Sequence, residues 1–364
     1  MTSSPSNSQG RKRGSTSTWN SKPTTNTTST KSTGPYSRAF QQNLIDHGVY
    51  LEGYEYPDGQ VTPLPDNWDD INQRLVQPRR SLSPSQFSNE AVRKFKRANA
   101  HAFMEKQVTI SVIPTIEGDI RDGRCVAGGI PFTNLDPLTD GTISPGSPDI
   151  FYGARPEQLN RGIRNELSGH IVPSTQKNLP MAPNFFLAAK GPDGSPAVAE
   201  RQACYDGALG ARGIHSLQSA GRAKPVYDKN AYTITSIYYS GTLKLYTSHL
   251  GQPTRPGGRP EYYMNQLNTW GMTGNPETFR QGATAYRNAR DWTKEKRDGF
   301  IEAANGKARD TYTESQSLRS FSYGQASTPV AGLVLVDSDT SADELALYDE
   351  QIYTSPSKRP RREV

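Results

Sequence analysis

Apolar residues along the chain follow two spacings, one typical of helices and one typical of strands. Helical spacing predicts helices over residues 36–49, 85–106, 156–167, 196–219 and 276–305. Continuous apolar runs or strict alternation predict extended segments over residues 108–116, 148–154, 184–190, 230–250 and 261–272. Residues 53–82 are rich in proline and aspartate, show neither spacing and are predicted to be irregular.

Local signals sharpen several of these elements. Ser85 or Ser88 could cap the helix that runs to Lys106. Ser240-Gly241 is a two-residue turn signal that divides residues 230–250 into the two strands of a hairpin. Strands that alternate with helices and then form a meander predict an α/β fold with a mixed central sheet flanked by helices. The glycine-rich phosphate-binding motifs GxGxxG and GxxxxGK[ST] are absent from the sequence.

Composition limits how much of the 364 residues can be core, because only 33% are hydrophobic and 27 are proline. Residues 1–34 are almost entirely Ser, Thr, Asn, Pro, Gly and basic residues, with no acid. Such a segment cannot bury enough apolar surface to offset the entropy of ordering it, so we predict a disordered tail. Residues 306–364 have a similar composition. A single folded domain with an N-terminal extension is therefore expected over residues 35–305.

The net charge of +6 is unevenly distributed. The first 34 residues contain five basic residues and no acid, whereas the predicted folded domain is close to neutral. The basic pI is therefore weak evidence for a nucleic-acid partner. The absence of an 18-residue apolar run predicts that no segment spans a membrane.

Targeting signals favour the nucleus. A compact basic cluster near the C-terminus is typical of nuclear import and comprises Lys358, Arg359, Arg361 and Arg362. No apolar secretory signal occurs at the N-terminus. The two cysteines, Cys125 and Cys204, form no CxxC pair, and a reducing compartment suits them.

One apolar run that is typical of a buried strand ends at a lysine. Five apolar residues, 185–189, precede Lys190, and a Gly-Pro-Asp-Gly turn follows. Asp149, after Pro148, begins another strand 41 residues earlier. Metal-dependent phosphodiester cleavage uses an aspartate at one strand end and an acid-x-lysine on the neighbouring strand, where two-residue spacing places acid and lysine on one face. Asp149 and Lys190 are therefore candidates for such a site.

Longer motifs strengthen this interpretation: "SPDIFYGARPEQL", "HIVPST", "PNFFLAAKGPDGS", "ERQACYDGALGARGIHSLQ" and "AYTITSIYYSGTLKLYTSHL". Over residues 85–305 the chain resembles a fungal family of PD-(D/E)XK nuclease-like proteins of unknown function. The resemblance implies a restriction-endonuclease-like core in which Asp149 and Lys190 match the motif aspartate and lysine. It further implies that the helix with Arg201 and Gln202 packs beside the site, and that Glu90 or Glu105 is the acid of the first helix.

The chain departs from the family pattern at Ala188, which stands where the pattern has Glu or Asp. Alanine has no oxygen for a metal, so Asp149 is the one clear carboxylate ligand for Mg²⁺. We therefore expect an inactive nuclease-like core without a cofactor, which acts by binding nucleic acid or protein. The alternative is an active Mg²⁺-dependent nuclease in which Asp193 or Glu200 supplies the displaced carboxylate.

Structural explanations compete with these functional ones. Lys190 and Asp149 can form an ordinary ion pair, which we expect to be their state beside Ala188. Glu90 and Glu105 suit a solvated helix face. Arg201 is a candidate for nucleic-acid binding, together with Lys190, but it too can lie on a solvated face. Cys204, on the apolar side of its helix, is expected to be a packing residue rather than a nucleophile.

A short apolar run followed by acids stands out in the C-terminal tail, within residues 332–345. The run and the first acid are Leu333, Val334, Leu335, Val336 and Asp337. A β-favouring run flanked by acids can add to the edge of a partner's sheet and resembles a SUMO-interacting motif. Docking on an edge of its own domain is an equal alternative.

Overall fold

A computed structural model of the chain describes residues 32–323 except 177, 254 and 256, with side chains described as far as residue 310. The folded unit ends at Thr313, and Glu314 begins a second unit. The elements are α1 (Arg38–Asp46), β1 (Val49–Tyr50), α2 (Trp68–Leu75), η1 (Arg80–Leu82), α3 (Asn89–His101), α4 (Glu105–Gln107), η2 (Val108–Val112), α5 (Ile113–Glu117), η3 (Gly123–Cys125), β2 (Val126–Ala127), β3 (Ile150–Ala154), η4 (Pro156–Gln158), α6 (Arg161–Glu166), α7 (Ser168–Ile171), β4 (Met181–Lys190), α8 (Pro196–Ser219), β5 (Thr233–Tyr239), β6 (Thr242–Gly251), β7 (Glu261–Gly271) and α9 (Pro276–Tyr323).

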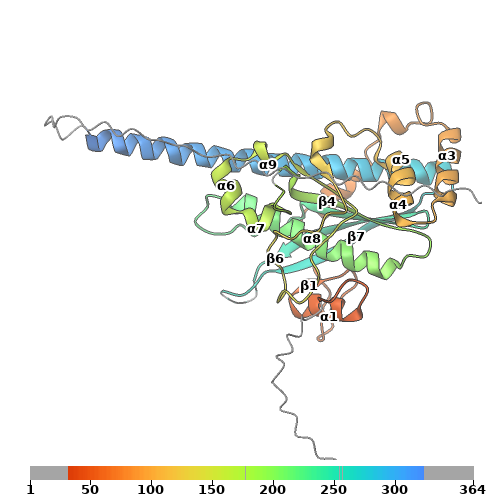
Figure 1. Cartoon of the computed structure of the whole chain (residues 1–364), viewed down its shortest axis with the longest axis horizontal. Helices are drawn as coiled ribbons and strands as arrows, with labels where there is room; N and C mark the ends of the chain where they lie inside the picture. The colour runs from red at the N-terminus through yellow and green to blue at the C-terminus, as the bar shows by residue number, and fades with distance from the viewer. Residues whose placement is uncertain (1–31, 177, 254, 256, 324–364) are drawn as a thin grey trace, which may run out of the picture. The chain divides into compact units, whose positions relative to one another are not determined.

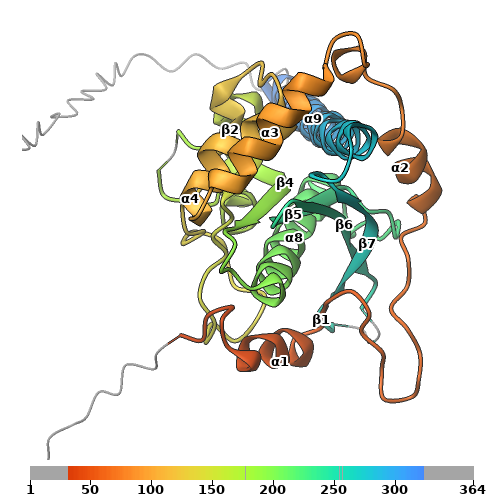
Figure 2. The same ribbon diagram turned by 90° about the vertical axis from the view of Figure 1, so that its right-hand side faces the viewer.

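The strands form one seven-stranded mixed sheet in the order β1-β7-β6-β5-β4-β3-β2. β4 is antiparallel to β3 and parallel to β5, and α8 makes the connection between the two parallel strands. Helices cover both faces, with α8 on one side and α3 and α9 on the other (Figures 1 and 2). The predicted α/β class with a mixed central sheet is confirmed.

β4 separates two hydrophobic cores. All ten of its residues are buried. Phe185, Leu187 and Ala189 belong to the core under α3, α5 and α9. Phe186 and Ala188 belong to the core under α8 and α1. Alternate side chains of a strand point to opposite faces, so one continuous apolar run serves both cores.

The turn after β5 has the geometry that its sequence predicts. Ser240 and Gly241 both have positive φ values, of 47° and 78°. Two such residues make the turn whose twist matches that of the flanking strands, and asparagine or glycine adopts it most readily. The hairpin β5–β6, the strand β7 and the helix α8 agree with the predicted ranges.

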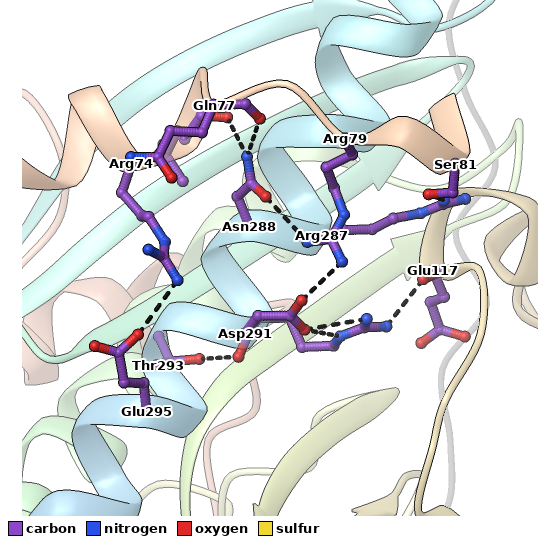
Figure 3. A network of polar contacts seen from close by, with 12 residues as sticks. Arg74, Gln77, Arg79, Ser81, Glu117, Arg287, Asn288, Asp291, Thr293 and Glu295 are labelled. Atoms are coloured by element: carbon purple, nitrogen blue, oxygen red, sulfur yellow. Dashed lines mark hydrogen bonds and ion pairs between the residues drawn. The ribbon is translucent and has the colours of Figure 1, made fainter. Parts of the chain in front are cut away.

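Helix α9 is tied to the N-terminal part of the domain through a polar network (Figure 3). Arg79 donates to Asp291 at 2.8 Å and to Asn288 at 3.0 Å. Asn288 in turn donates to the carbonyl oxygens of Leu75 and Gln77, at 3.0 and 2.7 Å. These bonds satisfy backbone carbonyls at the end of α2 that have no helical partner. They hold residues 74–79 against the helix.

Two predicted segments differ from the structure in the first third of the chain. Residues 53–82 are not wholly irregular, because Ile71 and Leu75, one helical turn apart, are buried on α2. The predicted extended segment 108–116 is instead helical (η2 and α5). Its β-branched residues suggested a strand, but four of them lie at helical spacing and pack into the core: Val108, Val112, Ile113 and Ile116.

The remaining differences concern where helices end. Ser88 caps α3 as predicted and accepts a hydrogen bond from the Ala91 amide, but the helix ends at His101 rather than at residue 106. The predicted helix 156–167 is divided, because Asn160 caps a new helix by accepting from the Gly162 amide. The last helix begins at Pro276 as predicted but continues past residue 305 to Tyr323. The predicted disordered tails are residues 1–34 and 306–364. Residues 1–31 and 324–364 lie outside the described residues, whereas residues 306–323 are helical and belong to α9.

Close packing of α8 on the sheet generates a stability prediction. A Cβ on Gly210 would lie 2.6 Å from a ring carbon of Phe186 and 2.9 Å from the Pro183 carbonyl oxygen. Overpacking costs about 1–3 kcal/mol, more than the roughly 1 kcal/mol that alanine gains in a helix. We expect Gly210→Ala to lower the free energy of unfolding, measured by urea denaturation.

Gly299→Ala on α9 is the matched control, because a Cβ there would have no neighbour within 4 Å. Its helix propensity should raise the free energy of unfolding by up to about 1 kcal/mol. Equal effects of the two substitutions would show that α8 does not pack as described.

Candidate functional site

Two adjacent strands bring Asp149 and Lys190 together. Asp149 directly precedes β3, and Lys190 is the last residue of β4. Ile150 pairs with Leu187, so the antiparallel register carries Asp149 to the level of Ala188. Asp149 Oδ2 accepts a hydrogen bond from the Ala189 amide at 2.7 Å and lies 3.9 Å from Lys190 Nζ. The ion pair expected between them is present but long.

Glu105, the first residue of α4, is the nearer partner of Lys190. Its Oε2 lies 2.9 Å from Lys190 Nζ. The Lys190 side chain is only 2% exposed, whereas that of Glu105 is 41% exposed. An ammonium taken out of water is costly unless it is paired and hydrogen-bonded, so Glu105 and Asp149 together keep Lys190 in place. Of the two first-helix acids, Glu105 is the one at the site.

Glu90 lies elsewhere, on the exposed side of α3. It forms ion pairs with Arg93 at 3.1 Å and Arg97 at 2.9 Å. These pairs hold the pKa of the Glu90 carboxyl below its usual value. The structure therefore supports the solvated-face interpretation for Glu90 and not a catalytic one.

A further acid, Asp206 on α8, is electrostatically coupled to this site. Its side chain is buried, and no hydrogen bond to its carboxyl is found among the described residues. Burial raises its pKa well above the usual value; the charge of Asp149 raises it further, and that of Lys190 lowers it. A buried carboxyl without a partner takes up a proton rather than remain charged.

The pKa of Asp149 is raised to about 7 for related reasons. Burial is the largest cause, the ammonium of Lys190 opposes it, and the negative charge of Glu105 adds to it. Groups with strongly shifted pKa values gather at functional sites, although structural ion-pair networks shift them too. Two carboxyl groups thus lie within 4 Å of the Lys190 ammonium, and the pKa of a third, that of Asp206, responds to its charge.

Ala188 lies two residues before Lys190 on β4, and its side chain belongs to the core under α8. It is 3% exposed and belongs to the same core as Ala203 and Cys204. Burial raises the pKa of the Cys204 thiol, as expected for a packing cysteine. No oxygen is available at position 188, and apolar neighbours cover it.

The arrangement fits Mg²⁺ poorly. Mg²⁺ requires several oxygen ligands in near-octahedral geometry. Glu105 and Asp149 instead share the Lys190 ammonium, and within the described residues no three His, Cys, Asp or Glu side chains form a group that could hold a metal. Asp149 and Glu105 are nevertheless the carboxylates that a cation beside Lys190 would meet.

The two acids expected to replace the missing carboxylate have other roles. Asp193 is exposed in the turn after β4. Glu200 forms an ion pair with Lys244 of β6 at 2.9 Å. Arg201 is buried and donates to the Pro35 carbonyl oxygen at 2.9 Å, so it ties the N-terminal segment to α8 rather than lying on a solvated face.

Gln202 lines a cavity of about 240 Å³ whose wall also includes Asp206. The amide oxygen of Gln202 is buried and has no hydrogen-bond partner. The helix that carries Gln202 therefore lies beside the cluster, as the resemblance implies.

Sequence reasoning passed over Asp206, although its position carries a signal. Asp206 comes three residues after Ala203 and four before Gly210, which is helical spacing along the small-residue side of α8. An acid on an apolar stripe is either paired or functional. Its burial shows that Asp206 lies on the packed side of α8.

The predicted C-terminal motifs cannot be placed. The import cluster of Lys358, Arg359, Arg361 and Arg362 lies outside the described residues. The segment from Leu333 to Asp337, with Val334, Leu335 and Val336, does so as well. In the described part of the chain, no helix has the length and hydrophobicity needed to cross a bilayer.

Comparison of the chain with protein families, with curated proteins and with solved structures found no match. The resemblance to nuclease-like proteins therefore stays a prediction from the sequence motifs.

The cluster predicts how the pKa of Asp149 responds to its neighbours. Glu105→Gln removes a negative charge and should lower this pKa, by about one pH unit. Lys190→Met removes the opposing positive charge and should raise it by at least as much. Carbon-13 NMR of the aspartate carboxyl groups measures both. Glu90→Gln, on the exposed face of α3, is the control and should leave the pKa of Asp149 unchanged.

The same pKa makes stability depend on pH. A carboxyl whose pKa is higher in the folded than in the unfolded state binds its proton more tightly when folded. Its contribution is complete below about pH 4 and is lost as the pH rises to about 7. The free energy of unfolding should fall by up to about 1.4 kcal/mol per pH unit in this range. Asp149→Asn should reduce this slope in urea denaturation and leave the part that comes from Asp206, whereas Asp193→Asn, in the exposed turn, should retain the full slope.

Proposed function

We propose that this chain is a nucleic-acid-binding protein built on a nuclease-like core that has lost cleavage. The observation that carries this proposal is the buried alanine, Ala188, at the position of the motif acid. An acid on β4 would share a strand face with Lys190 and hold a metal beside it. A methyl group there leaves the metal without its second ligand.

The state of Lys190 agrees with loss of cleavage. A catalytic lysine of this kind acts on the attacking water or the scissile phosphate, and its ammonium must reach them. Lys190 is instead buried and bound by Glu105 at 2.9 Å. Glu105 belongs to α4, so in this proposal α4 occupies the position next to Lys190 where water and phosphate would have to bind.

A basic surface next to this cluster supports nucleic acid as the partner. Helix α3 leads directly to Glu105 and exposes Arg93, Lys94 and Arg97, and Lys106 follows on α4. Phe103 and Met104, between the two helices, are exposed large apolar residues. Basic side chains interleaved with an aromatic suit a strand whose phosphates are neutralised and whose bases stack.

Nuclear localisation, through Lys358 to Arg362, and SUMO binding, through Leu333 to Asp337, belong to the same proposal. Both rest on the sequence alone. Import would place the protein with its nucleic-acid partner. The apolar and acidic segment would join it to a modified protein.

A cleavage assay tests the loss of activity. Wild-type protein is expected to leave single- and double-stranded DNA and RNA intact with Mg²⁺ or Mn²⁺. Lys190→Ala, purified in parallel, controls for contaminating nucleases. Cleavage by the wild type that disappears in Lys190→Ala would refute the proposal. Ala188→Glu, checked for folding by circular dichroism, should create activity if only the acid is missing.

A binding assay tests the partner. Lys94→Gln with Lys106→Gln should weaken binding of a fluorescent oligonucleotide and reduce the salt dependence by about one unit of slope per lost phosphate contact. Lys224→Gln with Lys229→Gln removes two exposed charges from another surface and is the matched control. Equal loss in the two double variants would indicate attraction by net charge rather than a site on α3 and α4.

A Mg²⁺-dependent nuclease with a displaced carboxylate is the second candidate. It is favoured by the positions of Glu105 and Asp206, two acids from helices that act on the same Lys190 and Asp149. This candidate requires Mg²⁺ binding that weakens in Asp149→Ala and in Asp206→Asn, measured by calorimetry. Cleavage that is lost in Asp206→Asn but retained in Asp193→Asn would establish it.

A further inference from the structure

A second cavity, of about 230 Å³, shares no lining residue with the Glu105, Asp149 and Lys190 cluster. Four of its lining residues are basic and come from four separate segments of the chain: His47 after α1, His170 on α7, Arg212 on α8 and Arg259 before β7. Asp136 is the acid among the lining residues, all of which are described. The cavity therefore has an excess of positive charge.

Arg212 is the basic residue of this cavity that is held in place by backbone hydrogen bonds. Its side chain is buried, and it donates to the carbonyl oxygens of Asp136 at 2.6 Å and Gly169 at 3.2 Å. Its Nε is also buried and has no hydrogen-bond partner. A buried guanidinium N–H without an acceptor is costly, and a ligand oxygen would relieve that cost.

The histidines are oriented by their Nδ1 atoms. Ser216 donates its hydroxyl to the Arg212 carbonyl oxygen, so its Oγ accepts from His170 Nδ1 at 2.8 Å. His47 Nδ1 donates to the Asn43 carbonyl oxygen at 2.8 Å. In each ring the Nε2 atom is left for another partner; that of His170 lies 3.7 Å from Asp136.

The surroundings of His170 disfavour its protonated form. Burial lowers its pKa, and the positive charge of Arg212 lowers it further, whereas Asp136 raises it too little to compensate. Asp136 is largely exposed, so water screens its charge. An anion within the cavity would interact with the charge of Arg212 and would favour protonation of His170.

We propose that this cavity binds the phosphate group of a ligand. Its basic groups approach from several directions, which suits a tetrahedral phosphate with three or four acceptor oxygens better than a planar carboxylate. Apolar wall residues, Pro137, Leu138 and Pro260, leave space for an uncharged part of the ligand beside the phosphate. Both a free nucleotide and a nucleic-acid backbone carry this group. The proposal does not depend on the state of Lys190.

NMR of the histidine Cε1 protons during addition of inorganic phosphate tests the proposal. The ionic strength is held constant with chloride. His170 and His47 should shift and saturate, and His170→Gln assigns its resonance. Arg259→Gln should weaken phosphate binding about tenfold, the effect of one charged hydrogen bond. Arg259 is exposed, so this change should leave the fold intact.

Arg255→Gln, an exposed arginine of the same loop that does not line the cavity, is the matched control. Shifts that do not saturate, or equal weakening by Arg259→Gln and Arg255→Gln, would overturn the proposal. Adenosine 5′-monophosphate and a ten-nucleotide DNA strand separate the two sources of phosphate. Tighter binding of the mononucleotide supports a free nucleotide, and tighter binding of the strand supports a backbone contact. The two proposals can fail separately. Phosphate binding in this cavity would stand even if the protein showed no nuclease activity and no oligonucleotide binding through α3.

Discussion

Burial of β4 on both faces is the constraint on which the rest of the structure depends. A strand with no solvent-facing side needs apolar cover above and below, and α9 with α3 and α5 supply one layer while α8 supplies the other. The same burial reaches the last residue of the strand. Lys190, the last residue of β4, is therefore buried and needs a partner. Glu105, on the short helix α4 between α3 and η2, provides it. The site is thus a consequence of how the sheet is covered.

Small residues on α8 determine how closely that cover fits. Gly207 and Gly210 each face side chains of the sheet at distances that admit no Cβ. Ala188 opposes this surface, so an acid at position 188 would need both volume and hydration that the packing does not offer. Asp206 lies on the same helix, and burial raises the pKa of its carboxyl, which favours the neutral, protonated form. An alanine at position 188 and a protonated carboxyl at Asp206 both limit the charge buried between β4 and α8.

Much of the fold could be predicted because its pattern is strong over long segments. α8, the β5–β6 hairpin and β7 each combine one consistent spacing with a clear start or turn signal. The segment 108–116 could not be predicted correctly, because β-branched residues favour strands and only tertiary contacts selected a helix. Pairing of Asp149 with Lys190 followed from strand spacing. The choice of Glu105 over Glu90 depended on the end of α3 at His101, which no local signal marks.

β1 pairs with only Tyr262 and Tyr263 of the eleven residues in β7. Beyond them, two amides of β7 donate to side chains: that of Gln266 to Glu52 and that of Thr269 to the neighbouring Asn268. Amides satisfied in this way are not available to a strand from another molecule. A sheet edge whose amides are satisfied by carboxylate and amide oxygens offers fewer donors to a strand from another molecule, so these two acceptors disfavour edge-to-edge pairing along this part of β7.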